Sequence, residues 1–270
     1  MKKVGMVLYV LIILACKQGP PDGLGLDKVD SNLKRNVDSC EQKMGLRPVK
    51  RIEVDSRHVS FYKLYKMVNE YREFLNSRTF KGSGSKLVFK FPIAQIFSAY
   101  KNADFIYEGL NYSPVAINSL ESILYTLNLD VNIVNQDLLQ AFQLLEYISD
   151  SARLLKRLVN NNLDEATLER LKVNKTAEEL AKINFYLGEA MNYRKQFIKQ
   201  LSMVLIEIAV KNFDRDFVLE RLANDIIGQG NNLRHGDIVE FRASMSRDII
   251  NLLYFSMRRS IDVVLCFIGN

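Results

Sequence analysis

The distribution of proline constrains this chain more than any other sequence feature. All five prolines lie within the first 114 residues, so residues 115–270 contain none. Because proline removes a backbone donor and clashes inside a helix, its absence favours long uninterrupted helices. Apolar residues spaced three and four apart recur through the same region. We therefore expect an all-α domain over residues 29–270, a bundle of about eight or nine helices.

Capping residues place several of the expected helix starts. Ser113 followed by Pro114 is an N-cap with proline in the first helical position. Thr176 and Glu179 form a capping box, and the apolar spacing after it predicts a helix of more than about 30 residues. Further starts are expected at Asp130 or Asn135, at Asp164, at Asp214 or Asp216, and at Asp237.

The N-terminal half of the domain gives a less regular pattern. One helix is expected from Val29 to about Met44, and a second is expected over the apolar residues from Val59 to Leu75. The inward stripe of this second helix is expected to comprise Val59, Tyr62, Tyr65, Val68, Tyr71 and Leu75. Residues 87–91 have an extended character without a partner strand, so they are interpreted as a lead into a third helix, from Pro92 to about Gly109.

The last expected helix, from Asp237 to about Ile268, contains two segments that are apolar nearly all round, 249–255 and 263–268. Such a helix is usually buried on several sides. We expect it to be the central helix of the bundle, with Leu252 and Leu265 in the core; the alternative is that one side forms a dimer seam. Its longest uncharged run, 249–257, is far shorter than the roughly 20 residues of a membrane span.

The N-terminus has the pattern of an export signal. Lys2 and Lys3 precede the uncharged, mostly apolar run from Val4 to Ala15, and Cys16 follows directly. We expect residues 1–15 to be a signal peptide, cleaved between Ala15 and Cys16. A small residue before cysteine is typical of a bacterial lipobox, in which the thiol becomes a diacylglyceryl thioether. The alternatives are an ordinary signal peptide with a chance cysteine, or a cytosolic protein with an apolar start.

The segment after Cys16 is rich in glycine and proline and shows no apolar periodicity. Residues 16–28 are therefore expected to form a flexible tether that begins at the lipidated cysteine. Two or three acyl chains on Cys16 would hold the protein at a membrane, because each buried CH₂ contributes about 0.8 kcal/mol.

Composition and charge exclude several function classes. Without Lys2 and Lys3 the chain has 35 basic and 31 acidic residues, an excess too small to indicate a nucleic-acid partner. Three cysteines exclude a four-cysteine zinc site, and His58 and His235 leave little room for another metal centre. No phosphate-binding loop or nucleophile motif is present. We expect no catalytic residue, no metal and no cofactor other than the covalent lipid, and hence not an enzyme.

Two cysteines remain within the domain, Cys40 and Cys266. Beyond an export signal they lie in compartments where a disulfide can persist. The alternative is that both are buried thiols acting as small apolar residues.

Basic residues recur at helical spacing along the middle of the chain. One interpretation is a surface for a glycosaminoglycan or another acidic host polymer; the other is an ordinary solvated helix face. The candidate contacts are Arg153, Lys156, Arg157, Arg194, Lys195 and Lys199. The sequence does not determine the oligomeric state.

The lipobox form, the Gly/Pro tether, the helical body and the 22 asparagines with many Lys and Ile resemble Borrelia-type spirochaetal outer-surface lipoproteins. The specific part of this resemblance covers residues 1–28. It implies a lipid on Cys16, an outer-membrane location and exposure at the cell surface. Members of the class bind complement regulators, matrix components or plasminogen, but no binding residue can be carried over. The alternative is a structural lipoprotein that faces the periplasm.

Overall fold

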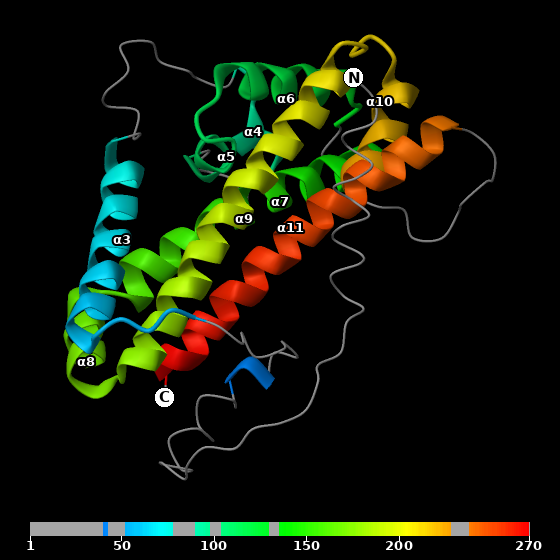
Figure 1. Ribbon diagram of the computed structural model, residues 1–270. Helices are drawn as coiled ribbons and strands as arrows, with labels where there is room; N and C mark the ends of the chain where they lie inside the picture. The colour runs from blue at the N-terminus through cyan, green and yellow to red at the C-terminus, as the bar shows by residue number, and fades with distance from the viewer. Residues whose placement is uncertain are drawn as a thin grey trace, which may run out of the picture. The chain divides into compact units, whose positions relative to one another are not determined.

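A computed structural model describes residues 40–42, 52–77, 90–97, 104–129, 135–227 and 238–269 of the chain (Figure 1). The described residues are helical, with no strand among them, so the predicted all-α multi-helix bundle is confirmed. They belong to one compact unit, residues 38–270. The expected signal peptide 1–15, the tether 16–28 and His235 lie outside the described residues.

The described helices vary from one turn to about nine turns in length. In chain order they are α3 (Arg57–Ser77), α4 (Ile93–Ile96), α5 (Asp104–Gly109), α6 (Pro114–Thr126), α7 (Gln136–Arg157), α8 (Glu165–Asn174), α9 (Ala177–Ala209), α10 (Arg215–Leu222) and α11 (Ile238–Gly269). Two π-helical segments extend helices: η2 (Leu158–Asn162) follows α7, and η3 (Ala223–Ile227) follows α10.

The predicted capping residues that the structure describes begin their expected helices, whereas Asp237 lies outside the described residues. Ser113 accepts a hydrogen bond from Ala116 N at the start of α6. At the start of α9, Thr176 and Glu179 make both hydrogen bonds of a capping box. Where the sequence left a choice, the caps are Asn135 for α7 and Asp214 for α10, and Asp164 caps α8.

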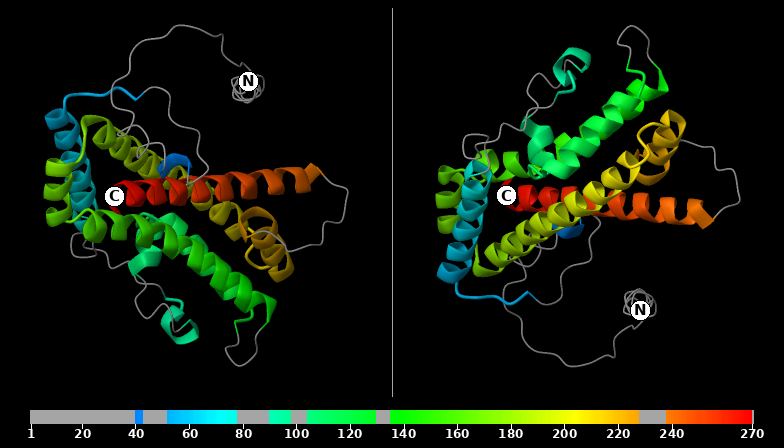
Figure 2. Two further views of the ribbon diagram at one scale, coloured as in Figure 1. Left: turned by 90° about the horizontal axis from the view of Figure 1, so that it is seen from below. Right: turned by 90° about the horizontal axis from the view of Figure 1, so that it is seen from above.

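The two longest helices, α9 and α11, pack along each other and form the centre of the bundle (Figures 1 and 2). Helices α3 and α6 also pack on α9, whereas α5 packs on α7. Among the fully buried side chains of the central pair are Phe197 and Leu201 on α9 and Met257 and Val264 on α11. The core thus lies along α9, which has neighbours on several sides.

The helix expected from Pro92 to Gly109 is wrong as one continuous element. Helix α4 ends at Ile96, and the backbone of Phe97 is extended, with φ −117° and ψ 90°. Phe91, Ile93 and Phe97 are all buried, an arrangement that a short turn achieves. The Glu121 carboxylate on α6 accepts hydrogen bonds from Lys90 N and Phe91 N, which anchors this segment.

The inward face of α3 is rotated from the expected stripe. Val59, Tyr62 and Tyr65 are 40, 60 and 39% exposed, whereas Phe61 and Leu64 face the core. Val68 and Leu75 belong to both stripes and are buried as expected. Tyrosine can lie at a surface because its hydroxyl is hydrated, so apolar spacing alone did not distinguish the two faces.

Helix α11 is not buried on all sides. Leu252 and Phe255 are 65 and 58% exposed, and Leu265 is half-buried. Met257 and Ile261 face α9 and the neighbouring segments, which cover one side of the helix only. The expectation that Leu252 lies in the core is therefore wrong, and the dimer-seam alternative stays open. None of the described helices is long and apolar enough to cross a membrane.

Residues 40–42 are joined to both central helices. Cys40 and Cys266 form a disulfide, with their Cα atoms 5.8 Å apart, so the disulfide alternative describes this structure. The carboxylate of Glu41, which is fully buried, accepts hydrogen bonds from Lys182 Nζ at 3.2 Å and from the Tyr186 hydroxyl at 2.8 Å. Burial and the Glu41 carboxylate both raise the pKa of Tyr186, so this phenol remains a donor.

Candidate functional site

The six candidate basic residues lie on two helices and in three different environments. Arg153, Lys156 and Arg157 are on α7, whereas Arg194, Lys195 and Lys199 are on α9. Lys195, Lys199 and Arg157 are exposed, with no ion pair to a described carboxylate. Arg194 is only 4% exposed, so its expected role as a contact on the open surface is wrong.

Two of the α7 residues are engaged locally. Lys156 Nζ lies 3.0 Å from the carboxylate of Glu108, which is 4% exposed. Arg153 lies 3.9 Å from Asp150, and both cations also lie over the Phe105 ring. The six residues therefore do not act as one cationic surface, because part of the charge on α7 is neutralised by neighbouring acids.

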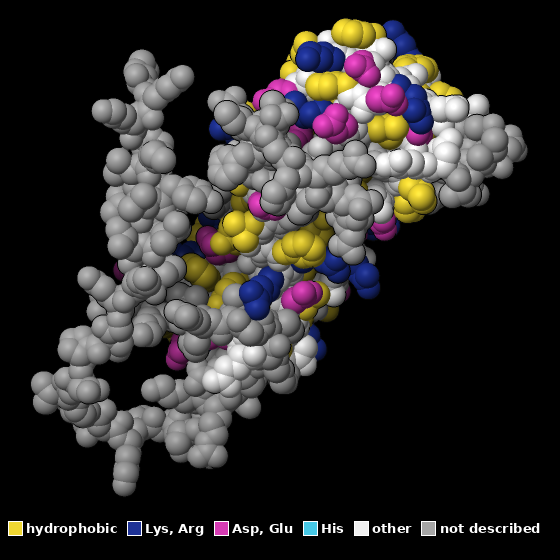
Figure 3. Space-filling view, turned by 90° about the vertical axis from the view of Figure 1, so that its right-hand side faces the viewer, with side chains coloured by type: hydrophobic (Ala, Val, Ile, Leu, Met, Phe, Trp, Pro, Cys, Tyr) yellow, Lys and Arg dark blue, Asp and Glu magenta, His cyan; other side chains and the backbone are white. Residues whose placement is uncertain are grey.

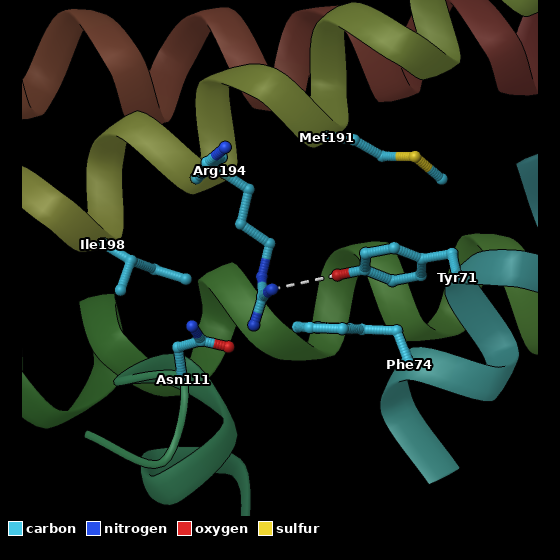
Figure 4. A pocket seen from close by; sticks show the side chains of 7 residues that line it. Tyr71, Phe74, Asn111, Met191, Arg194 and Ile198 are labelled. Atoms are coloured by element: carbon cyan, nitrogen blue, oxygen red, sulfur yellow. Dashed lines mark hydrogen bonds between the residues drawn. The ribbon is translucent and has the colours of Figure 1, made fainter. Parts of the chain in front are cut away.

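Arg194 reaches from α9 into the interior of the bundle. Figure 4 shows its side chain extending between Tyr71, Phe74 and Asn111. Its guanidinium donates to the Tyr71 hydroxyl at 2.9 Å, to the Glu108 carbonyl at 2.8 Å and to the Ser151 carbonyl at 3.3 Å. The sequence contained a signal for this burial, because Arg194 lies three or four residues from Ala190 and Phe197, which are both buried.

The turn between α5 and α6 forms one wall beside Arg194. Gly109 ends α5 so close to α7 that a Cβ there would lie 2.2 Å from the Ile148 carbonyl oxygen. Asn111 and Tyr112 follow with φ values of 53° and 55°, in the left-handed backbone region that residues other than glycine rarely adopt. Tyr112 N donates to the Tyr107 carbonyl at 2.8 Å, which closes the turn. Residues held in such a conformation cluster at functional sites.

Two adjoining cavities open beside this turn. One has a volume of about 380 Å³ and the other about 510 Å³, and they share Asn111, Lys195 and Ile198. The first is also lined by Tyr71, Phe74, Met191 and Arg194, and the second also by Leu110, Asn192, Lys199 and Ser202, among others. We call the two cavities together the α9 cleft.

The described charges that line the α9 cleft are of one sign. They are Arg194, Lys195 and Lys199, with no aspartate or glutamate among the described lining residues. Elsewhere the described charges are mixed: on the face in Figure 3, Lys and Arg side chains are interspersed with Asp and Glu. The α9 cleft therefore combines three cations with apolar side chains, an arrangement suited to an anionic ligand.

The sequence pointed to the three cations of the α9 cleft but missed its other walls. Tyr71, Phe74, Asn111, Met191 and Ile198 come from α3, the α5–α6 turn and α9, and no local motif relates them.

The described residues contain no candidate metal site. No group of three His, Cys, Asp or Glu side chains there could hold an ion, and His58 is exposed at the start of α3. No protein-family model matches this chain, and neither a curated protein nor a solved structure does.

Proposed function

We propose that this chain is a lipid-anchored, non-enzymatic protein of the outer cell envelope that binds an acidic macromolecule of a host or vector. The partner classes are a complement regulator, a matrix component or a glycosaminoglycan. The observation that carries the proposal is the exposed pair Lys195 and Lys199 at the rim of the α9 cleft, whose described lining residues include no acidic side chain.

The anchor part of the proposal is supported by the sequence. Lys2 and Lys3, the apolar run to Ala15 and the junction with Cys16 follow the order of a lipoprotein signal. Cys16→Ala should abolish incorporation of labelled palmitate and leave the precursor uncleaved. Normal labelling of that variant would contradict lipidation at Cys16.

The surface location is tested by adding protease to intact cells. A protein that faces outward is degraded under these conditions, whereas one that faces the periplasm is protected until the outer membrane is opened. Protection in intact cells would favour the alternative, a structural lipoprotein of the envelope.

Binding is tested with a sulfated polysaccharide, heparin, as an immobilised probe. Lys195 and Lys199 are one helical turn apart, so both can contact one acidic chain. The Lys195→Gln/Lys199→Gln variant should elute at clearly lower salt than the unmodified protein, because it has lost two cationic contacts with the heparin chain. Salt screens the remaining exposed charge pairs, so less salt then suffices for elution.

The matched control is Lys172→Gln/Lys211→Gln, which removes two exposed charges from residues that line neither cavity. This control should elute close to the unmodified protein. Equal shifts in the two double variants would mean that net charge, and not the α9 cleft, determines retention. Absence of retention of the unmodified protein would contradict a glycosaminoglycan as the partner.

A further inference from the structure

The floor of the α9 cleft holds a buried positive charge whose described hydrogen-bond partners are all neutral. Arg194 donates to two backbone carbonyls and one phenol, and it forms no ion pair with a described carboxylate. The nearest acid along these contacts, Glu108, already pairs with Lys156. Buried charges are costly unless they are paired. Arg194 therefore has no carboxylate of its own among the described residues, although the charge of Glu108 acts on the neighbouring Tyr71.

Arg194 also retains donors for a ligand. A guanidinium has five N–H groups, and the described acceptors take one on each of its three nitrogens. One N–H on each terminal nitrogen is left as a donor for an anionic oxygen.

The Tyr71 hydroxyl adds a third donor. It accepts a hydrogen bond from Arg194, so its own proton is available for another acceptor. Burial raises the pKa of Tyr71, with Arg194 opposing and the negative charge of Glu108 adding to the rise, so the phenol is protonated at neutral pH.

The same cavity also has an apolar lining. Phe74, Met191 and Ile198 belong to it, with Met191 and Ile198 on opposite sides of the Arg194 side chain in Figure 4. A cavity of about 380 Å³ lies within the usual range for small-molecule sites. Methionine adapts readily to the shape of an aliphatic chain.

We infer that the α9 cleft binds a free carboxylate-bearing amphiphile of the fatty-acid class. The carboxylate lies on Arg194 and Tyr71, and the hydrocarbon chain lies along Phe74, Met191 and Ile198. This inference is separate from the proposed macromolecular partner, because it depends on Arg194 and Tyr71, although Lys195 also lines the same cavity.

The test is calorimetric titration of laurate, below its micellar concentration, into the full-length chain. The protein carries Cys16→Ala, which removes the acylation site, and has the Cys40–Cys266 disulfide formed. Residues 4–15 are common to all variants, so any contribution from that apolar run cancels in the comparison. Dodecanol, with the same chain length and no charge, is the ligand control.

Laurate should bind saturably at one site and dodecanol much more weakly. Arg194→Gln should weaken laurate binding by about tenfold or more, because it removes a charge-assisted interaction. Tyr71→Phe, which keeps the ring and removes one donor, should weaken it by about threefold to tenfold. Arg153→Gln removes an arginine outside the cleft and should leave the affinity unchanged.

Three outcomes would overturn the inference: no saturable binding of laurate, equal affinity for laurate and dodecanol, or unchanged affinity in Tyr71→Phe. The last outcome decides the matter even if Arg194→Gln does not fold. If the unmodified protein is retained on heparin but does not bind laurate, the proposed macromolecular function stands and the fatty-acid inference fails. If it binds laurate but is not retained on heparin, the fatty-acid inference stands and a glycosaminoglycan partner is contradicted.

Discussion

Arg215 at the start of α10 donates two hydrogen bonds to the fully buried carboxylate of Asp137 at the start of α7, at 2.6 and 2.7 Å. Asn128 N donates a third, at 2.8 Å. Burial by itself would raise the pKa of Asp137, but the hydrogen bonds and the positive charge of Arg215 outweigh it and hold this pKa below its ordinary value. The pair therefore joins two helices that are far apart in the sequence.

Replacing Arg215 with glutamine should destabilise the protein at pH 7, because it leaves a buried carboxylate without its cation. The lowered pKa means that this contribution is present above the unfolded pKa of about 3.9 and is lost as the pH falls below it. Urea unfolding at pH 7 and near pH 3 should therefore show a difference between variant and unmodified protein that shrinks in acid. Lys63→Gln, which breaks the more exposed pair with Asp55, should destabilise the protein much less than Arg215→Gln does. A difference that persists unchanged in acid would contradict this account.

Two glycines should respond in opposite ways to alanine. Gly109→Ala places a Cβ against the Ile148 backbone and should destabilise the protein by about 1–3 kcal/mol, as overpacking does. Gly188, within α9, has nothing within 4 Å of an added Cβ, so Gly188→Ala should stabilise it by about 0.5–1 kcal/mol through helix propensity. Thermal unfolding followed by circular dichroism measures both. The account of the α5–α7 contact fails if Gly109→Ala is as stable as the unmodified protein.

Alanine substitutions on the buried and exposed faces of α11 should differ in their effect on the free energy of unfolding. Met257 is fully buried, and Met257→Ala should cost about 2–5 kcal/mol of unfolding free energy. Leu252 is 65% exposed, and Leu252→Ala should cost less than about 0.5 kcal/mol in a monomer. Denaturant unfolding is combined here with sedimentation analysis. A large cost at Leu252 that depends on protein concentration would indicate the dimer seam.

Removing the disulfide with Cys40→Ser/Cys266→Ser should destabilise the protein by about 2–5 kcal/mol, because the bond closes a long loop in the unfolded chain. The two cysteines are 226 residues apart in the sequence. The unmodified protein should lose a similar amount when unfolded in a reducing agent, whereas the double variant should not respond to it. Equal unfolding midpoints for the unmodified protein with and without reductant would contradict the Cys40–Cys266 disulfide.

The helix starts could be predicted from the sequence because a cap is made within one turn. Ser113 with Pro114 and Thr176 with Glu179 carry all of the chemistry that they need in adjacent residues. The break after Ile96 could not be predicted in this way. It depends on burial of Phe97 and on Glu121, which lies 30 residues further along the chain and anchors Phe91 N.

The buried faces of the helices and the floor of the α9 cleft also could not be predicted, because they depend on residues far apart in the sequence. Apolar spacing predicted one stripe for α3, and the structure, in which α3 packs on α9, buries a face rotated from it. Arg194 was identified as part of a basic series, but its burial depends on Tyr71 and on the carbonyls of Ser151 and Glu108, from three separate helices. Long-range acceptors of this kind leave no local pattern.

The linkage at Cys40 determines how a mechanical load would pass through the molecule. For a chain held at Cys16, tension travels along residues 17–39 and enters the bundle at Cys40. The disulfide transfers it to the end of α11, and Glu41 transfers part of it to α9 through Lys182 and Tyr186. Tension between Cys40 and α9 would then act on the Glu41 hydrogen bonds directly and on the contact between α9 and α11 through the disulfide.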